Sequence, residues 1–262
     1  MNSVNKTLYI PLYGKAYVSG RGIILRDERA EEIWKREGFP LKGKAKSRWL
    51  ACFMAIRAAV YDDWVRKALE DMPNATVLHI GCGLDSRAER VAAKGTQWYD
   101  IDFPEVIAER RGYYSESPCY HMLPVDMRTS RWKTAIEAGE AAVVVLEGVS
   151  MYFAPEELRE LLSGLAGHFS RIRLLMDCYS ERAAALSGFK NPINSVGVTA
   201  VYGYDNPEEL AKQSGLLFTK EQNMTPGEYL RQLGGMEGIL FKKLFAGRLS
   251  RSMYKMYEFV KA

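Results

Sequence analysis

Residues 76–104, with the sequence TVLHIGCGLDSRAERVAAKGTQWYDIDFP, constrain the fold of this chain more than any other stretch. A short apolar run ends at G-C-G (81–83), an amphipathic segment follows, and a second run ends at D-I-D (100–102). Two glycines let the backbone turn tightly and bring N–H groups close to a ligand at a helix N-terminus. Asp102 lies about 20 residues further on, where an acid at a strand tip accepts hydrogen bonds from ribose hydroxyls. The stretch therefore predicts a strand–helix–strand unit that binds an adenosine-containing cofactor.

The residues after the glycine turn indicate which cofactor this is. The dinucleotide fingerprint has a third glycine where this chain has Ser86, followed by the bulky Arg87. Asp85 lies near the start of the expected helix, where its charge would repel a pyrophosphate but tolerates the cationic end of S-adenosylmethionine. These residues favour S-adenosylmethionine over a nicotinamide cofactor. Taken alone, the stretch also fits another nucleotide-binding unit or a purely structural one.

Apolar and amphipathic segments continue to alternate beyond this unit. Further strands are expected at 119–125, 141–146, 172–176, 216–221 and 253–260, and further helices at 104–114, 155–169, 207–215 and 226–244. The alternation predicts an α/β fold with a doubly wound, mostly parallel seven-stranded sheet. Residues from about 180 to 205 contain the breakers NPINSVG and YGYDNP and predict an insertion after the fifth strand.

The chain before this unit is expected to form an arm and a long helix. Residues 7–17 are apolar and aromatic but are interrupted by a proline and a glycine, whereas 27–37 has a helical pattern. The long helix is expected at 47–72, with Ser47 as its N-cap and Pro73 closing it.

These boundaries predict two parts of the chain. We expect residues 1–72 to form a lid on the cofactor pocket and residues 73–262 to form the cofactor-binding core. Packing of the arm against the core, without a role in binding, is the alternative.

Acidic residues follow three of the expected strands in succession. They are Asp102, Asp126 and Glu147. Because the carboxyl ends of parallel strands meet at one edge of the sheet, where doubly wound folds bind their ligands, these carboxylates are expected to lie together. In that order they fit a ribose, an adenine amino group and a methionine ammonium.

Arg57 lies at the edge of an apolar stripe on the long helix, within two turns of Phe53 and Val60. A guanidinium held among aromatic side chains needs an anion as its partner. The spacing leaves two kinds of partner open. One is a structural ion pair with Asp62 or Asp63, and the other is the carboxylate of a bound ligand.

Composition limits the partners of the chain. The 36 basic and 32 acidic side chains give a net charge of +4, which is too mild to indicate nucleic acid. The four cysteines show no C-x-x-C spacing, which indicates reduced thiols and no bound metal. No apolar run approaches the length of about 18 residues that a membrane span needs, and no signal-peptide pattern opens the chain. We expect a cytoplasmic protein without nucleic-acid or membrane partners.

Together these motifs resemble those of class I S-adenosylmethionine-dependent methyltransferases. More narrowly, the chain is similar to the leucine carboxyl methyltransferase family, which includes bacterial polyketide O-methyltransferases of the tetracenomycin type. The resemblance covers roughly residues 7–180. It is carried by TLYIPLYGKA (7–16), AIRAAVYD (55–62), GCGLDSR (81–87), DIDFP (100–104), VDMR (125–128) and LEGVSMYF (146–153).

The resemblance implies a Rossmann-like methyltransferase fold with S-adenosylmethionine as the cofactor. The cofactor-binding residues that it implies are Lys15, Arg57, Gly81, Gly83, Asp102, Asp126, Met127 and Glu147. Lys15 and Arg57 would hold the methionine carboxylate. Asp126 and Met127 would frame the adenine, and Glu147 would face the amino-acid end.

The methyl acceptor is inferred from the histidines. A carboxylate acceptor needs no general base, whereas a phenol normally needs one, most often His. His79 and His121 fall within expected strands and His168 near the end of a helix, so no catalytic residue is assigned. This favours a small-molecule acid, such as a polyketide-type carboxylic acid, as the acceptor. The candidate acceptor-binding residues are Tyr13, Arg21 and Tyr152.

Two other functions fit the same residues. One is methyl transfer to the C-terminal carboxylate of a protein. The other is binding of the cofactor without catalysis, as in a sensor or a partner subunit.

Overall fold

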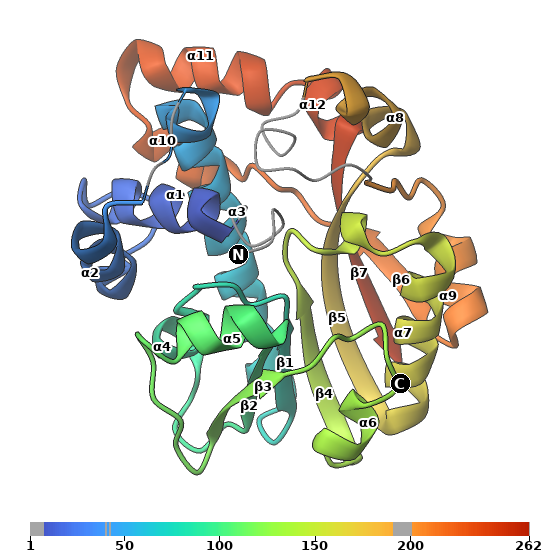
Figure 1. Cartoon of the computed structure of the whole chain (residues 1–262). Helices are drawn as coiled ribbons and strands as arrows, with labels where there is room; N and C mark the ends of the chain where they lie inside the picture. Colours follow the sequence, from blue (N-terminus) through green and yellow to red (C-terminus); the bar gives the residue numbers. More distant parts are fainter. Residues whose placement is uncertain (1–7, 40, 42, 191–200, 262) are drawn as a thin grey trace.

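The computed structural model describes residues 8–39, 41, 43–190 and 201–261 (Figure 1). Within these residues seven strands form one sheet in the order β3-β2-β1-β4-β5-β7-β6. The strands are β1 Thr76–Ile80, β2 Trp98–Asp102, β3 Tyr120–Pro124, β4 Gly139–Leu146, β5 Phe169–Tyr179, β6 Leu217–Glu221 and β7 Tyr254–Lys261. Strands β1 to β5 are parallel, and β7 is antiparallel to both β5 and β6. The predicted doubly wound, mostly parallel sheet is confirmed.

Helices cover both faces of this sheet. They are α1 Tyr9–Ser19, α2 Glu28–Glu37, α3 Arg48–Asp71, α4 Arg87–Val91, α5 Pro104–Arg110, α6 Trp132–Ala135, α7 Pro155–His168, α8 Glu181–Lys190, α9 Pro207–Ser214, α10 Gly227–Gln232, α11 Gly235–Phe245 and α12 Arg248–Met253. Short 3₁₀ turns, η2 Gly43–Lys46 and η3 Ser150–Tyr152, precede α3 and α7.

The central strand β4 explains why both faces need cover. Val143 and Val145 pack into the core cluster that contains the apolar stripe of α3. Val144 and Leu146 point the other way and pack with α7 and α9. Alternate side chains of a strand point to opposite faces, so an unbroken apolar run requires a layer on each side.

The N-terminal segment folds differently from the expectation. The interrupted segment at 7–17 is the helix α1, because Pro11 falls in its first turn, where the backbone N–H groups have no intrahelical partner. Gly14 lets α1 approach α3 closely, since a Cβ at this position would lie 2.8 Å from the carbonyl oxygen of Ala51. The expected N-cap of the long helix is present, because the Ser47 side chain accepts a backbone N–H group. Asp27 caps α2 in the same way.

The C-terminal segment also departs from the expectation. The single helix expected at 226–244 is two helices, α10 and α11. Gly234 and Gly235 separate them at φ +50° and +47°, a left-handed conformation that ends a right-handed helix. Part of the expected insertion at 180–205 is the helix α8, and residues 191–200 lie outside the described residues. Among the described helices, none combines the length and the apolar character that crossing a membrane requires.

Helices α8, α11 and α12 lie together at one end of the molecule (Figure 1). We call these three helices the cap. The cap is formed by residues 181–190 and 235–253, which are far apart in the sequence.

Candidate functional site

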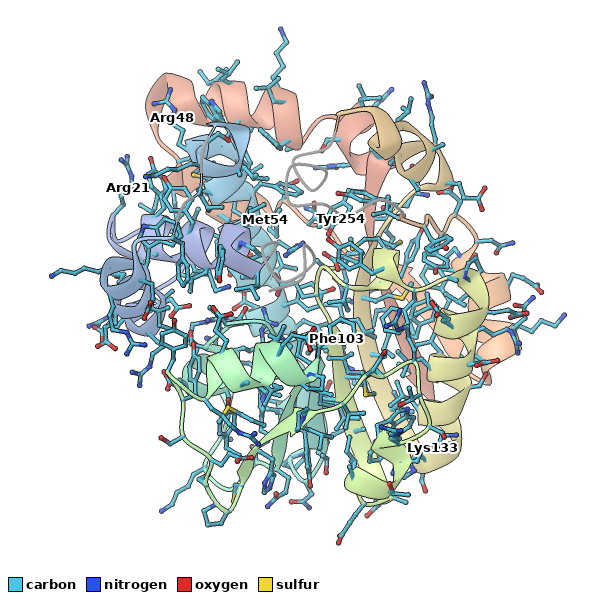
Figure 2. All side chains as sticks on the ribbon, in the orientation of Figure 1. Arg21, Arg48, Met54, Phe103, Lys133 and Tyr254 are labelled. Carbon is cyan, nitrogen blue, oxygen red and sulfur yellow. The ribbon has the colours of Figure 1, made fainter. Side chains whose placement is uncertain are left out.

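A cavity of about 640 Å³ lies at the carboxyl ends of β1, β2 and β4. The strand order reverses between β1 and β4, which is the position where doubly wound sheets bind ligands. Helices α1 and α3 contribute side chains to one wall, and the cap contributes to the mouth. Figure 2 labels three lining residues, Met54, Phe103 and Tyr254, which come from different parts of the chain.

The glycine turn after β1 has a backbone that only glycine adopts easily. Gly81 has φ +69° and Gly83 has φ +52°. A side chain at Gly81 would also overlap Val149, so the turn lies directly against the segment after β4. Both glycines line the cavity.

Asp102 at the end of β2 is held in a fixed orientation. Its Oδ2 accepts the Gly83 N–H at 2.9 Å, and its Oδ1 accepts the Phe103 N–H at 2.8 Å. Burial raises the pKa of the Asp102 carboxyl to about 6, against the effect of these two hydrogen bonds. The carboxylate therefore joins the first two strand ends and keeps further acceptor capacity, since a carboxylate has about four lone-pair sites.

Arg110, which was not singled out from the sequence, binds the backbone of the same glycine turn. Its guanidinium donates to the carbonyl oxygens of Gly83 at 3.0 Å and Asp85 at 2.6 Å. It also forms an ion pair with Asp100, and both side chains are fully buried. The sequence contains the two opposite charges of this pair, Asp100 on β2 and Arg110 on α5, but their spacing does not predict that they meet.

Glu147 at the end of β4 lies between two guanidinium groups. Its Oε1 accepts from Arg57 Nε at 2.9 Å, and its Oε2 forms an ion pair with Arg87. These two cations lower the pKa of Glu147, although burial alone would raise it. Glu147 is therefore ionised at neutral pH, and it faces the cavity together with Arg57.

The partners of Arg57 are not those expected on its own helix. Arg57 Nη1 lies 3.2 Å from Asp177 and 2.9 Å from the Tyr254 hydroxyl. Of the two alternatives left open by the spacing, the ion pair with Asp62 or Asp63 is not formed. Residues five and six positions along a helix point away from Arg57, and these two acids instead bind other basic residues. Asp62 contacts Arg87 and Arg90, and Asp63 contacts Arg66.

Asp177 near the end of β5 is a residue that the sequence reasoning missed. Its Oδ1 accepts the Gly148 N–H at 2.6 Å, and its Oδ2 accepts from Arg57 and Tyr254. Burial raises the pKa of Asp177, although Arg57 opposes the shift. The signal was available, because this acid follows the apolar run of the fifth strand as the other acids follow theirs.

Lys15 ties the arm to the glycine turn. Its Nζ lies 3.1 Å from Asp85 Oδ2, and the side chain is 2% exposed. Both residues line the cavity. Asp126 and Met127 line it from the segment after β3, where Arg128 pairs with Asp126. All eight of the cofactor-binding candidates therefore border one cavity.

The three acceptor-binding candidates are not brought together. Tyr152 lines the cavity, whereas Tyr13 and Arg21 do not. Tyr13 packs against Trp34 of α2, with ring centroids 4.8 Å apart. Arg21 lies over Tyr17 and borders a separate cavity of about 230 Å³. Tyr13 points to another side of α1 than Lys15, which lines the cavity. Arg21 lies beyond the end of this helix.

The three histidines, all within the described residues, have structural positions. His79 borders the cavity, but it is buried and contacts Asp100 through one ring nitrogen and Arg87 through the other. His121 stacks on Tyr99, and the ring of His168 bonds a backbone oxygen.

The cavity wall toward the cap is largely apolar. It includes Phe53, Met54, Met151, Phe153, Phe245 and Met253. The charged part of the lining consists instead of carboxylates that follow the strands and of Lys15, Arg57 and Arg128, which pair with them. One cavity therefore combines an ionic half with an apolar half.

Several known proteins are similar to this chain in sequence. The family described as leucine carboxyl methyltransferase matches residues 12–166. The tetracenomycin polyketide synthesis O-methyltransferase TcmP of Streptomyces glaucescens is 28% identical over 233 residues, which cover 88% of this chain and 86% of that protein. The S-adenosyl-L-methionine-dependent methyltransferase dpfgK of Gibberella zeae is 24% identical and covers 92% and 90% of the two chains.

A solved structure supports the fold. The magnesium protoporphyrin IX methyltransferase of Synechocystis PCC 6803, crystallised with S-adenosylhomocysteine, superposes with a TM-score of 0.52 at 14% identity. The superposition covers 90% of this chain and 93% of that structure.

Proposed function

The chain belongs to the leucine carboxyl methyltransferase family and is a methyltransferase that uses S-adenosylmethionine, and we propose that it methylates an oxygen atom of a small, largely apolar acid. The tetracenomycin relative is named as an O-methyltransferase of polyketide synthesis, which supports this class of acceptor. The proposal has two parts, one for the cofactor and one for the acceptor.

The ionic half of the cavity fits the cofactor. Its described lining carries three cations, Lys15, Arg57 and Arg128, and four carboxylates, Asp85, Asp102, Asp126 and Glu147. The excess negative charge suits a ligand with a sulfonium cation. A Cβ at Gly81 would overlap Val149, so this position has to be glycine. A turn without side chains also lets a ligand approach the backbone closely.

In our proposal Asp102 accepts the ribose hydroxyls, while Asp126 and Met127 frame the adenine. Arg57 holds the methionine carboxylate, and Glu147 receives the ammonium. Lys15 contributes from the arm, which acts as a lid. When bound, S-adenosylmethionine supplies an electrophilic methyl group on its sulfonium.

The apolar half of the cavity would hold the acceptor. Aromatic and thioether side chains there exclude water and favour a flat apolar molecule. Exclusion of water desolvates the attacking oxygen. Contact with the cavity wall aligns it with the methyl group. Tyr152 is the proposed hydroxyl donor that orients an acceptor carboxylate.

The observation that carries the choice of a carboxylate is the placement of the histidines. His121 and His168 do not line the cavity. His79 does, but Asp100 and Arg87 engage its two ring nitrogens, so none of the three is positioned as a general base. A carboxylate is already anionic at neutral pH and needs no base.

One observation favours a hydroxyl acceptor as the second candidate. Tyr254 lines the cavity, and its hydroxyl donates to Asp177, whose pKa is raised. An acceptor O–H proton would pass to the Tyr254 oxygen while the Tyr254 proton passes to Asp177. The acceptor oxygen would then attack the methyl group as an alkoxide or phenolate.

The test uses S-adenosylmethionine with an isotopically labelled methyl group. Parent enzyme is incubated with apolar aromatic acids, with their preformed methyl esters, and with phenols that lack a carboxyl group. We expect labelled product from the acids alone, and mild base should release the label as methanol because esters hydrolyse. Asp102→Ala, in which cofactor binding should be weakened, serves as the control and should give less labelled product at a limiting cofactor concentration.

Other outcomes identify the competing reactions. A labelled product that resists base would be an ether, and its loss in Tyr254→Phe would support the hydroxyl acceptor. Base-labile label on a polypeptide would support methylation of a protein carboxylate and would contradict a small-molecule acid.

A further inference from the structure

The exposed large apolar side chains of the protein are concentrated at the cap. The described residues contain seven of them, and five lie on α8, α11 and α12: Leu186, Ile239, Leu240, Leu244 and Leu249. Ile239 and Leu249 are each 71% exposed. Leaving aliphatic side chains in water at one end of a protein is unfavourable, and such a group indicates a binding surface.

Basic residues accompany these side chains. Residues 238–257 contain five cations and no acid. Lys255 pairs with Asp205, but the remaining four are exposed, and among the described residues none of the four forms a salt bridge. They are Lys242, Lys243, Arg248 and Arg251. Two acids flank this range in the sequence, Glu237 on α11 and Glu258 on β7. The neighbouring helices α8 and α10 carry Glu181 and Glu228.

This surface borders the mouth of the large cavity. Leu186 belongs both to the exposed group and to the cavity lining. Ser250 and Met253 of α12 and Phe245 of α11 also line the cavity. Whatever covers the cap therefore lies beside the entrance to the apolar half.

We propose that the cap docks on the headgroup region of an anionic lipid bilayer, with the cavity mouth facing the lipid. The charges are complementary, because exposed and unpaired cations flank the aliphatic side chains on the same two helices. Amphipathic basic segments with leucines on their apolar side bind anionic interfaces in this way. The five apolar anchors are all aliphatic, whereas protein–protein interfaces depend mainly on Trp, Tyr and Arg.

This mode of binding differs from the one that the sequence excluded. The expectation of no membrane partner rested on the absence of a long apolar run. A helix that lies in the plane of the interface needs no such run.

Docking itself does not depend on the identity of the acceptor. Docking would let an apolar acceptor enter the cavity from the lipid, and this consequence rests on the proposed function. Vesicle binding is therefore measured without methyl transfer, so that failure of one proposal is distinguishable from failure of the other.

The experiment is co-sedimentation of the full chain with vesicles. One set contains only phosphatidylcholine, and the other contains phosphatidylcholine with one third phosphatidylglycerol. We expect the parent protein to bind the anionic vesicles at least about tenfold more tightly, since each cation near such a surface contributes to binding. High salt should reduce this preference.

Two variants of the cap are compared with two matched controls. Lys242→Glu/Lys243→Glu reverses two charges on α11, and Arg131→Glu/Lys133→Glu reverses two charges beside α6, at the other end of the molecule (Figure 2). Leu249→Ser removes an exposed leucine from α12, and Leu217→Ser removes one from β6 that is 63% exposed. Circular dichroism and S-adenosylhomocysteine binding verify that all four variants fold.

We expect each cap variant to lose on the order of tenfold in affinity for anionic vesicles and each control to bind as the parent does. Equal binding of the parent to both vesicle sets would overturn the proposal. So would equal losses in cap and control variants. Loss in the charge variant without loss in Leu249→Ser would indicate an acidic macromolecule as the partner. A parent dimer that Leu249→Ser dissociates, without vesicle binding, would show that the face pairs with a second copy.

Discussion

Among single residues, Asp102 gives the cofactor site a defined dependence on pH. Its carboxyl has a pKa of about 6 because it is buried, and only the ionised form accepts both ribose hydroxyls. Affinity for S-adenosylhomocysteine should therefore be constant above this pKa and fall as the pH drops below it. At pH 5 about one tenth of the carboxyl is ionised, so we expect roughly tenfold weaker binding than at neutral pH by calorimetric titration.

Asp102→Asn tests the assignment of this dependence. The variant should bind weakly at both pH values, and the ratio of its two dissociation constants should be close to one. If the parent lost no affinity between pH 7 and pH 5, Asp102 would not be the group that binds the ribose in its ionised form.

Arg57 has both a structural and a proposed cofactor-binding role, and two ligands separate them. Arg57→Lys keeps the charge beside Glu147 and Asp177 but loses the two-pronged contact with a carboxylate. We expect about tenfold weaker binding of S-adenosylhomocysteine. Binding of 5′-methylthioadenosine, which lacks the amino-acid end, should stay within about twofold.

Arg90→Lys is the matched control for this comparison. The Arg90 side chain is 8% exposed, against 6% for Arg57, and it pairs with Asp27, Asp62 and Asp85 but does not line the cavity. Its replacement should lower the free energy of unfolding and affect both ligands alike. Equal weakening of both ligands by Arg57→Lys would mean that the helix is disturbed and would remove the carboxylate assignment.

The sequence indicated the residues of the site better than their contacts. Acids at strand ends follow from the position of apolar runs, and Asp177 obeys the same rule because it directly follows the apolar run at 172–176, although the strand continues to residue 179. The partners of Arg57 and Arg110 could not be read in this way. They depend on which strands are neighbours, and such contacts join residues distant in the sequence.

At the level of elements, the contact between α1 and α3 should be sensitive to a single methyl group. A Cβ at Gly14 would lie 2.8 Å from a backbone oxygen and 3.0 Å from Met54 Cβ. Gly14→Ala should therefore push the two helices apart and lower the free energy of unfolding by about 1–3 kcal/mol, measured by urea denaturation.

Gly20→Ala, in the residue that ends the same helix, is the control. Gly20 has φ −63°, which alanine adopts freely, and its Cβ would have ordinary clearance of 3.4 Å. Its stability should be unchanged or slightly higher. A loss as small for Gly14→Ala would show that the helices adjust without strain.

The helices also show where propensity misleads. Pro11 and Gly14 argued against a helix, yet a first-turn proline is harmless and the glycine serves contact between helices. At the other end of the chain the helix expected at 226–244 runs across Gly234 and Gly235, although these two glycines divide it. The role of a glycine depends on its neighbours in space, which the local sequence does not reveal.

For the whole molecule, the proposed lid predicts a pattern of hydrogen exchange. Ile10, Pro11 and Lys15 of α1 line the cavity, whereas α7 lies against the sheet away from it. Saturating S-adenosylhomocysteine should slow amide exchange in residues 9–19 more than in residues 155–168. Mass spectrometry of exchanged peptides measures the difference. Equal slowing in both helices would indicate general stabilisation and no lid.

The overall architecture was the most predictable feature. Alternating strands and helices, with an unbroken apolar run at β4, leave few arrangements other than a doubly wound sheet. The placement of the cap was not predictable, because α8 and α11 are far apart in the sequence and both line one cavity. Nothing in their local sequences encodes that shared position.

The strand order has a consequence for synthesis of the protein. In the described structure β6 pairs only with β7, which the ribosome makes later, and β7 also brings Tyr254 to Arg57 and Asp177. While β7 is still inside the exit tunnel, β6 and one edge of β5 present unpaired backbone groups. The nascent chain can assemble β1 to β5 first, but β7, which lies between β5 and β6, is added last. We therefore expect a chaperone to bind the unpaired edge of β5.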